Sequence, residues 1–191
     1  MALAFFYTLL NLYYSLFFKI ASIFCNIVFV MSDSHSAINP VICKRLKNAK
    51  KIIHAGDWST PEVYHDMLEI TNDVYAVHGN TETREMDELL PEVRKIDLYG
   101  NKILIRHEID SLKNFEIFGH TDEKIDIVIF GHTHKAFKKK IKGTVLYNPG
   151  SCGPKRFAGV APSYGVIYFI GKFFFIRTHS IYFQKREGSF I

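Results

Sequence analysis

Five short runs of apolar residues in this chain each end in a cluster of polar side chains that can bind a metal. The clusters are Asp33-Ser34-His35, Gly56-Asp57, Gly79-Asn80, His107 and Gly131-His132-Thr133-His134. The preceding runs are rich in β-branched and aromatic residues, which is typical of strands. Because open α/β folds place their active sites where strands end, we predict that these donors share one edge of a sheet. Gly56, Gly79 and Gly131 suit the sharp turns after such strands, since glycine tolerates positive φ and close backbone approach.

The types of donor restrict the metal. Carboxylates, imidazoles and one amide oxygen suit Mn²⁺, Fe, Zn²⁺ or Ni²⁺ better than an ion that prefers thiolates. If two divalent ions are bound, Asp33, Asp57 and a bridging hydroxide leave one positive charge uncompensated, which would attract an anion such as phosphate. Paired metals about 3.5–4 Å apart also lower the pKa of a bound water and hold both oxygens of an in-line displacement.

The order D-x-H, G-D, G-N, H and G-H-x-H resembles the pattern of the calcineurin-like metallophosphoesterases, in particular their small single-domain prokaryotic phosphodiesterase branch. The stretch Tyr147-Asn148-Pro149-Gly150-Ser151 also resembles that branch, and the resemblance covers about residues 26 to 180. It implies two paired sheets flanked by helices. It also implies two metal sites that share Asp57: one is held by Asp33, His35, Asp57 and His134, and the second by Asp57, Asn80, His107 and His132.

Two positions depart from the family pattern. Thr81 follows Asn80 where strong monoesterases of the family usually carry a histidine that can protonate the leaving group. Loss of that acid would restrict the enzyme to good leaving groups, or leave protonation to another residue or to water. Glu108 follows His107 where glycine is common, and the sequence leaves open whether it perturbs the site or points away.

Taken singly, each cluster has an ordinary explanation, because a lone histidine after a strand is more often a hydrogen-bonded core or edge residue than a ligand. Five clusters in the family's order favour a metal centre. His54, His65, His78, His120 and His179 have no such support, and we expect structural roles for them. The three cysteines, Cys25, Cys43 and Cys152, are widely spaced, so no disulfide framework is indicated and a reducing compartment is favoured.

The pattern of elements favours an α/β fold with a two-sheet β-sandwich flanked by helices. Asn39-Pro40 predicts a helix through about Lys47, and Thr60-Pro61-Glu62 predicts another through about Ile70. Three hairpins are predicted around Gly100-Asn101, Lys142-Gly143 and Gly171-Lys172. With 48% hydrophobic residues and no linker, residues 26–191 are expected to form one metallophosphoesterase domain.

Residues 1–25 are an apolar N-terminal extension in which Lys19 is the only charge. Its length reaches the threshold for a membrane-spanning helix, but it lacks the basic start and small-residue cleavage site of a secretory signal. Three interpretations stay open: a membrane anchor, an apolar helix packed on the domain or in an oligomer contact, and an extension from a misplaced start codon. We expect a cytoplasmic protein, with membrane association as the alternative.

The net charge of +5 would also suit a nucleic acid or an anionic membrane as partner. The densest basic run contains Lys135, Lys138, Lys139, Lys140 and Lys142. We favour a solvated hairpin edge for this run, since lysines discourage pairing between strand edges, with steering of phosphorylated substrates as the alternative.

These observations lead us to interpret the chain as a binuclear phosphodiesterase in which a metal-bridging hydroxide attacks phosphorus in line. We assign catalytic roles to Asp33, His35, Asp57, Asn80 and His107. The expected cofactor is two divalent ions per chain, Mn²⁺ first and Ni²⁺, Zn²⁺ or Fe as alternatives, and the expected substrate is a small phosphodiester. The alternatives are a non-catalytic scaffold of the same fold, as in the retromer scaffold subunit, and a phosphomonoesterase or nuclease.

Overall fold

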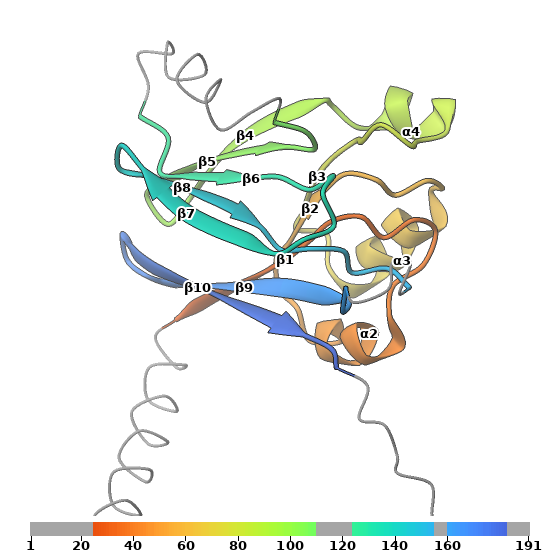
Figure 1. The fold of residues 1–191 in the computed structure, drawn as a ribbon, viewed down its shortest axis with the longest axis horizontal. Coiled ribbons are helices and arrows are strands. Elements are labelled where there is room, and N and C mark those ends of the chain that lie inside the picture. The colour runs from red at the N-terminus through yellow and green to blue at the C-terminus, as the bar shows by residue number, and fades with distance from the viewer. Residues whose placement is uncertain (1–24, 110–123, 155–159, 183–191) are drawn as a thin grey trace, which may run out of the picture.

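Two five-stranded sheets form the centre of the molecule (Figure 1). The computed structural model describes residues 25–109, 124–154 and 160–182. The first sheet has the order β10-β9-β1-β2-β3 and the second β4-β5-β6-β8-β7. Strands of the first sheet are β1 (Asn26–Met31), β2 (Ile52–Ala55), β3 (Val74–Val77), β9 (Ser163–Ile170) and β10 (Phe173–Ser180). Strands of the second are β4 (Val93–Leu98), β5 (Asn101–Arg106), β6 (Ile127–Ile129), β7 (Phe137–Ile141) and β8 (Thr144–Asn148).

The sandwich forms because successive side chains of a strand point to opposite faces of its sheet. In β1, Val28 and Val30 join the core between the sheets, whereas Met31 joins the core beneath the helices. In β5, Ile103 and Ile105 face that same inter-sheet core, and Leu104 belongs to a smaller cluster on the outer side. The prediction of a two-sheet sandwich with flanking helices is therefore confirmed.

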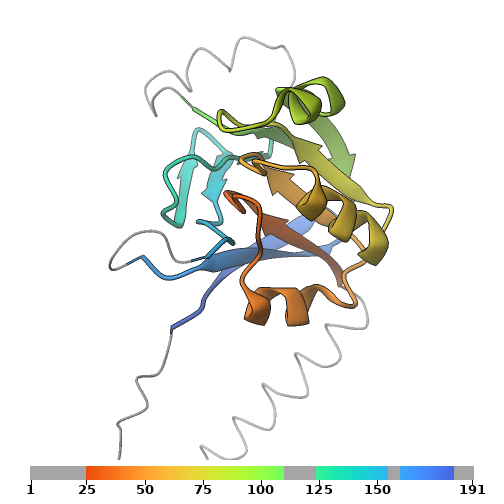
Figure 2. The same cartoon turned by 90° about the vertical axis from the view of Figure 1, so that its right-hand side faces the viewer.

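Two helices cover part of the outer face of the first sheet. They are α2 (Pro40–Leu46) and α3 (Glu62–Ile70), which lie beside β1, β2 and β3 in Figure 2. Ile42 and Leu46 from α2 and Val63 and Met67 from α3 are buried in one cluster with strand residues such as Ile52. These helices return the chain between parallel strands, and so bring the carboxyl ends of β1, β2 and β3 to the same end of the molecule.

The expected helix starts are largely observed. The side chain of Asn39 caps α2 by accepting a hydrogen bond from the Val41 amide at 3.0 Å, with Pro40 as the first helical residue. In α3, Pro61 precedes the first helical residue, and no side chain caps this helix. A third helix, α4 (Arg84–Leu89), was not predicted, because only Met86 of its six residues is buried and it carries almost no apolar pattern.

All three predicted hairpins are present. Tyr99 and Gly100 both have positive φ, 55° and 75°, as a tight hairpin turn requires, so the first turn lies one residue earlier than predicted. Lys142 and Gly143, at 48° and 93°, form the equivalent turn between β7 and β8. The hairpins contribute the antiparallel strands, so each sheet is mixed.

One prediction about the donors was wrong: they do not line the edge of a single sheet. Three clusters end β1, β2 and β3 of the first sheet, and two end β5 and β6 of the second. The two sheet ends meet across the sandwich, where the His132 amide after β6 donates to Asp33 Oδ1 after β1. The predictions for residues 1–24 lie outside the described residues. Within the described ranges, no helix is long and apolar enough to cross a membrane.

Candidate metal centre

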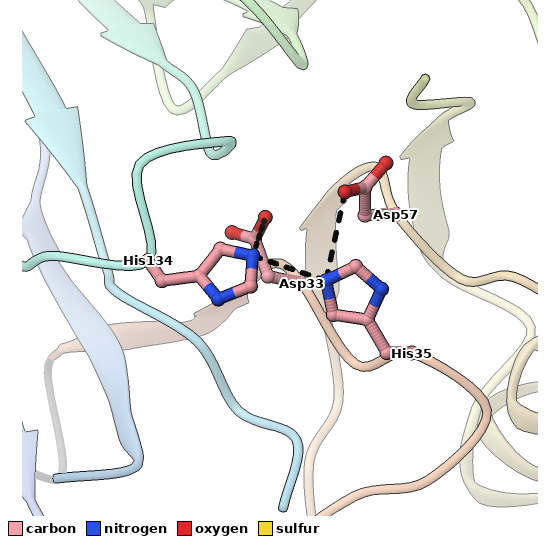
Figure 3. A group of neighbouring side chains, drawn as sticks. All are labelled: Asp33, His35, Asp57 and His134. Carbon is pink, nitrogen blue, oxygen red and sulfur yellow. Dashed lines mark hydrogen bonds and ion pairs between the residues drawn. The ribbon is translucent and has the colours of Figure 1, made fainter. Parts of the chain in front are cut away.

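Four of the predicted donors form one compact group (Figure 3). One ligand atom from each of Asp33, His35, Asp57 and His134 lies within 4.8 Å of those of the other three. Loops after β1, β2 and β6 supply them, and His134, at 11% side-chain exposure, is slightly accessible. These residues are separated by up to about a hundred positions in sequence, so only the fold brings them together.

The other three donors form a second group beside the first. Asn80 Oδ1 lies 3.0 Å from His107 Nε2 and 3.2 Å from His132 Nδ1. His107 is buried and its Nδ1 lies 2.7 Å from the carbonyl oxygen of Ala55, so Nδ1 is the donor and Nε2 faces the group. All seven predicted donors therefore occupy two adjoining clusters.

Asp57 lies between the two groups. Its Oδ2 is 3.6 Å from His35 Nε2 in the first group, and its Oδ1 is 3.2 Å from His107 Nε2 in the second. Oδ1 also accepts backbone hydrogen bonds from Asn80 at 2.9 Å and Thr81 at 3.1 Å. One carboxylate thus faces both groups with different oxygens, which is the arrangement that a bridging ligand needs.

The first group fits a cation. His35 Nε2 and His134 Nε2 are only 3.0 Å apart, and His134 Nε2 is 3.3 Å from Asp33 Oδ1. These two imidazole nitrogens converge on one small volume beside buried carboxylates, and each offers a lone pair there when it carries no proton. Imidazole and carboxylate donors suit divalent transition metals, so the residues match the expected type of ion.

Without a metal, the surroundings of the second group favour a proton on His107. Burial raises the pKa of Asp57. The hydrogen bond from His107 and the charges of His107 and His35 together lower it by more than burial raises it, so the pKa of Asp57 lies below its usual range. Burial lowers the pKa of His107, but its hydrogen bond to Asp57 and the charges of Asp57 and Asp33 raise it above the usual value. A metal at His107 Nε2 would replace this proton, since metal ligands must be deprotonated.

Backbone strain is concentrated at the donors. Asp33, His35, Asp57, His132 and His134 have φ between 48° and 68°. A non-glycine residue in such a sparsely populated conformation costs about 1–3 kcal/mol and persists only where its surroundings enforce it. These residues are held there by the sharp turns that leave the strands.

Close approach explains the glycines beside the donors. Gly56 has a φ of 86°, as expected. At Gly79 a Cβ would lie 2.2 Å from Asp57 Oδ1, and at Gly131 it would lie 2.8 Å from Asp33 Oδ2. Any side chain at Gly79 or Gly131 would therefore displace a donor carboxylate.

Glu82 supports the site in a way that the sequence analysis missed. Its carboxylate accepts backbone hydrogen bonds from Trp58 at 3.0 Å, Ser59 at 2.7 Å and Gly79 at 2.8 Å. It thus ties the loop after β2, which carries Asp57, to the loop after β3, which carries Asn80. The only signal in the sequence is an acidic residue two positions after Asn80.

The Tyr147–Ser151 stretch supports the other donor loops. Asn148 Nδ2 donates to the Gly131 carbonyl at 2.6 Å, and Ser151 Oγ donates to the Asp33 carbonyl at 2.7 Å. Ser32 Oγ donates to Asp33 Oδ2 at 2.6 Å. These bonds hold the first and last donor clusters in register.

The two departures from the family pattern both lie at the site. Thr81 Oγ1 is 3.5 Å from His35 Nδ1, on the side of that ring away from the donor group. Glu108 Oε1 is 3.5 Å from His132 Nε2, so Glu108 points toward the second group. The question that the sequence left open for Glu108 is thereby answered.

The remaining described histidines lie outside the two groups. His54 is fully buried, stacks on Trp58 with 3.6 Å between ring centroids, and has a pKa well below the usual value because of burial. His78 lies near Asp87, with 3.5 Å between Nδ1 and Oδ1. Cys152 is buried, and burial raises its thiol pKa. His120 lies outside the described residues.

The lysine run occupies an edge. Strand β7 is the last strand of the second sheet, and Lys138, Lys139 and Lys140 on it are exposed. This position agrees with the interpretation that the lysines protect a hairpin edge.

Comparison with known proteins gives a consistent result. Residues 27–169 match the model of the calcineurin-like phosphoesterase superfamily domain. A phosphodiesterase from Methanocaldococcus jannaschii is 28% identical over 139 residues, which cover 64% of this chain and 82% of that protein. A probable metallophosphoesterase from Mycoplasma genitalium is 30% identical over 145 residues, covering 72% of this chain and 83% of the relative.

Solved structures show the same fold. Vacuolar protein sorting 29 from Cryptosporidium parvum superposes with a TM-score of 0.73 at 20% identity, covering 83% of this chain and 93% of that one. The family match spans most of the chain and contains all five donor clusters. The chain therefore belongs to the calcineurin-like phosphoesterase superfamily.

Proposed function

We propose that the protein is a phosphodiesterase that uses two divalent metal ions to hydrolyse small phosphodiesters. The observation that carries this proposal is the position of Asp57, whose two carboxylate oxygens face separate donor groups. The relative from Methanocaldococcus jannaschii carries the name phosphodiesterase, which supports the same class of reaction.

Asp33, His35, Asp57 and His134 would hold one ion, and Asp57, Asn80, His107 and His132 the second. Two such ions, Mn²⁺ being our first expectation, would supply a hydroxide for in-line attack and neutralise charge on the phosphoryl oxygens. The protein's own contribution is to hold the donors in place. Glu82, Asn148 and Ser151 fix the loops, and Ala55 directs His107 Nε2 toward the site through the bond to Nδ1.

A cavity beside the second group has room for a small ester group. Its volume is about 280 Å³, and Asn80, His107, Arg106 and Glu108 are among the residues that line it. Arg106 is held by Glu92, with 3.5 Å between Nη2 and Oε1. A small, partly charged cavity next to the proposed metals suits one alcohol group of a diester.

The alternative of a non-catalytic scaffold draws on the similarity to vacuolar protein sorting 29, which at 20% identity concerns the fold alone. The complete donor set favours catalysis, because a scaffold does not need two adjoining metal-binding groups. A phosphomonoesterase is less well supported because Thr81, not histidine, follows Asn80.

The test combines metal content with activity. Protein purified without chelator and incubated with Mn²⁺ should contain about two ions per chain by elemental analysis, because seven donors with one bridge offer four contacts to each ion. A content near zero at saturating Mn²⁺ would promote the scaffold.

Activity should then depend on the bridging and the second-site donors. Asp57→Asn and His107→Ala should each lose most activity on bis-p-nitrophenyl phosphate. His65→Ala, which changes a histidine of α3 outside both groups, is the matched control and should retain activity. Wild-type rates in Asp57→Asn or His107→Ala, with metal content measured in parallel, would place the site elsewhere.

A further inference from the structure

Three of the seven large apolar or aromatic side chains that are exposed in the described ranges lie on the outer face of β9 and β10. Register fixes which side chains share this face: Tyr168 pairs with Phe175, Ile170 with Phe173, and Tyr164 with His179. The alternate residues Ile167, Phe169 and Ile176 fill the core between the sheets. Phe173 is 82% exposed, Ile170 46% and Phe175 43%, because α2 and α3 pack on the other half of the sheet.

This face continues into a groove at the start of β1. The groove has a volume of about 610 Å³. Ile27 and Phe29 of β1 and Tyr164 and Tyr168 of β9 are among its apolar lining, and its charged lining is Arg45, Lys50, Lys51 and Asp73. Its aromatic side chains stack, with 6.1 Å between the ring centroids of Phe29 and Tyr164 and 4.4 Å between those of Tyr168 and Phe175. This aromatic part of the lining and the adjoining face suit a bound apolar segment.

The chain itself supplies such a segment at this place. Cys25 and Asn26 line the groove, so residues 1–24 join the described structure at its edge. Residues 1–18 carry no charge, and Lys19 is the only charged residue of the segment. An apolar stretch of this length is costly to leave in water, and covalent attachment at the groove makes its local concentration high.

The lengths also agree. As a helix, 18 residues would extend about 27 Å, and the eight residues of β10 extend about 26 Å. Residues 19–24 can span up to about 20 Å between such a helix and Cys25. Arg177 pairs with Val166 between the aromatic pairs of this face and is exposed, so an uncharged segment would meet no charge repulsion there.

We propose that residues 1–24 pack on the outer face of β9 and β10 and cover this part of the first sheet. The occupant is this chain's own N-terminal segment, in the same molecule. Packing of this kind makes the segment a structural part of the domain, and it does not depend on the proposed metal chemistry.

Lys19 provides a built-in probe, because trypsin cuts after it and residues 1–18 contain no other site for this protease. The full-length chain is treated with trypsin, and the loss of residues 1–19 is followed by mass spectrometry. Phe175→Asp and Phe173→Asp should speed this cleavage about tenfold or more, since each places a charge where we expect apolar contact. Leu89→Asp, at a 49% exposed leucine of α4, is the matched control and should not change the rate.

Phe173→Asp guards against misfolding, because this side chain is largely exposed and its loss leaves the Tyr168–Phe175 stack intact. Thermal unfolding of each variant confirms the fold. Equal cleavage rates in wild type, Phe173→Asp and Phe175→Asp would overturn the proposal. Protection that appears only with phosphatidylserine vesicles would show a membrane as the occupant, and protection that grows with protein concentration would show a second copy; either result also overturns it.

Discussion

Replacing Glu82 by glutamine tests whether the two central donor loops are held by one carboxylate. Glu82 Oε1 accepts from the amides of Trp58 and Gly79, and Oε2 accepts from the Ser59 amide at 2.7 Å. Glutamine has one acceptor oxygen, so it can keep the first two bonds only by turning its NH₂ group toward the Ser59 amide. One charge-assisted hydrogen bond is then lost and two donors face each other.

The expected cost follows from that bond count. A hydrogen bond to a charged group contributes about 1.5–3 kcal/mol, so Glu82→Gln should lower the free energy of unfolding by about that amount. Glu82→Ala should cost more, because all three amides lose their partner. Both variants should also weaken metal binding, since the loops that carry Asp57 and Asn80 are no longer joined.

The assay is urea unfolding of the metal-free protein, together with a Mn²⁺ titration of each variant. Glu85→Gln, which removes the charge of an exposed residue on α4, is the matched control. If Glu82→Gln matches wild type within about 0.5 kcal/mol, the range of an ordinary surface substitution, and binds Mn²⁺ equally well, then Glu82 does not hold these loops.

Two further predictions concern protons. Without metal, the raised pKa of His107 stabilises the fold fully below pH 6.5, the usual histidine value, and this stabilisation is lost as pH rises through the raised pKa. The lowered pKa of Asp57 stabilises the fold fully above pH 3.8, and this stabilisation is lost as pH falls through the lowered pKa. The contribution of this pair to the free energy of unfolding in chelator should therefore be greatest between pH 3.8 and 6.5, and Asp57→Asn should remove the alkaline decline that the pair causes; an unchanged decline in that variant would show that another group is responsible. The second prediction starts from Thr81, which cannot donate a proton as histidine could, so the hydrolysis rate should fall steeply as the pKa of the leaving group rises. Thr81→His should increase the rate for alkyl esters more than for aryl esters. The reason is that general acid catalysis is worth about 10²–10⁴-fold only where the leaving group needs a proton. Rates on a series of aryl and alkyl phosphodiesters check this, and a shallow wild-type slope that Thr81→His leaves unchanged would indicate another proton donor, with Glu108 as the next residue to test.

Glu82 directly follows Thr81, where an acidic side chain could supply that proton. The structure makes this role unfavourable, because three backbone amides already point at its carboxylate and stabilise the ionised form. A local motif indicated that an acidic residue follows Asn80, but the motif carries no information on which amides surround it. The role of Glu82 depends on a loop more than twenty residues away in sequence.

The sequence by itself determined what depends on neighbouring residues. Each donor follows a strand, Asn39 and Pro40 start α2, and small turns connect the three hairpins, because strand alternation, helix capping and tight turns are set within a few residues. The donor types, and therefore the kind of metal they suit, are also readable from the chain.

Only the tertiary structure decided how the two sheets divide the donors. The pairing of β1 with β9, and of β6 with β8, joins segments that no local pattern links, and it places two sheet ends opposite each other. The contact of Glu108 with His132 and the open face of β9 and β10 follow from that same pairing. Strand partners are selected by the burial of whole faces, a property of the assembled sandwich that no single segment of the chain contains.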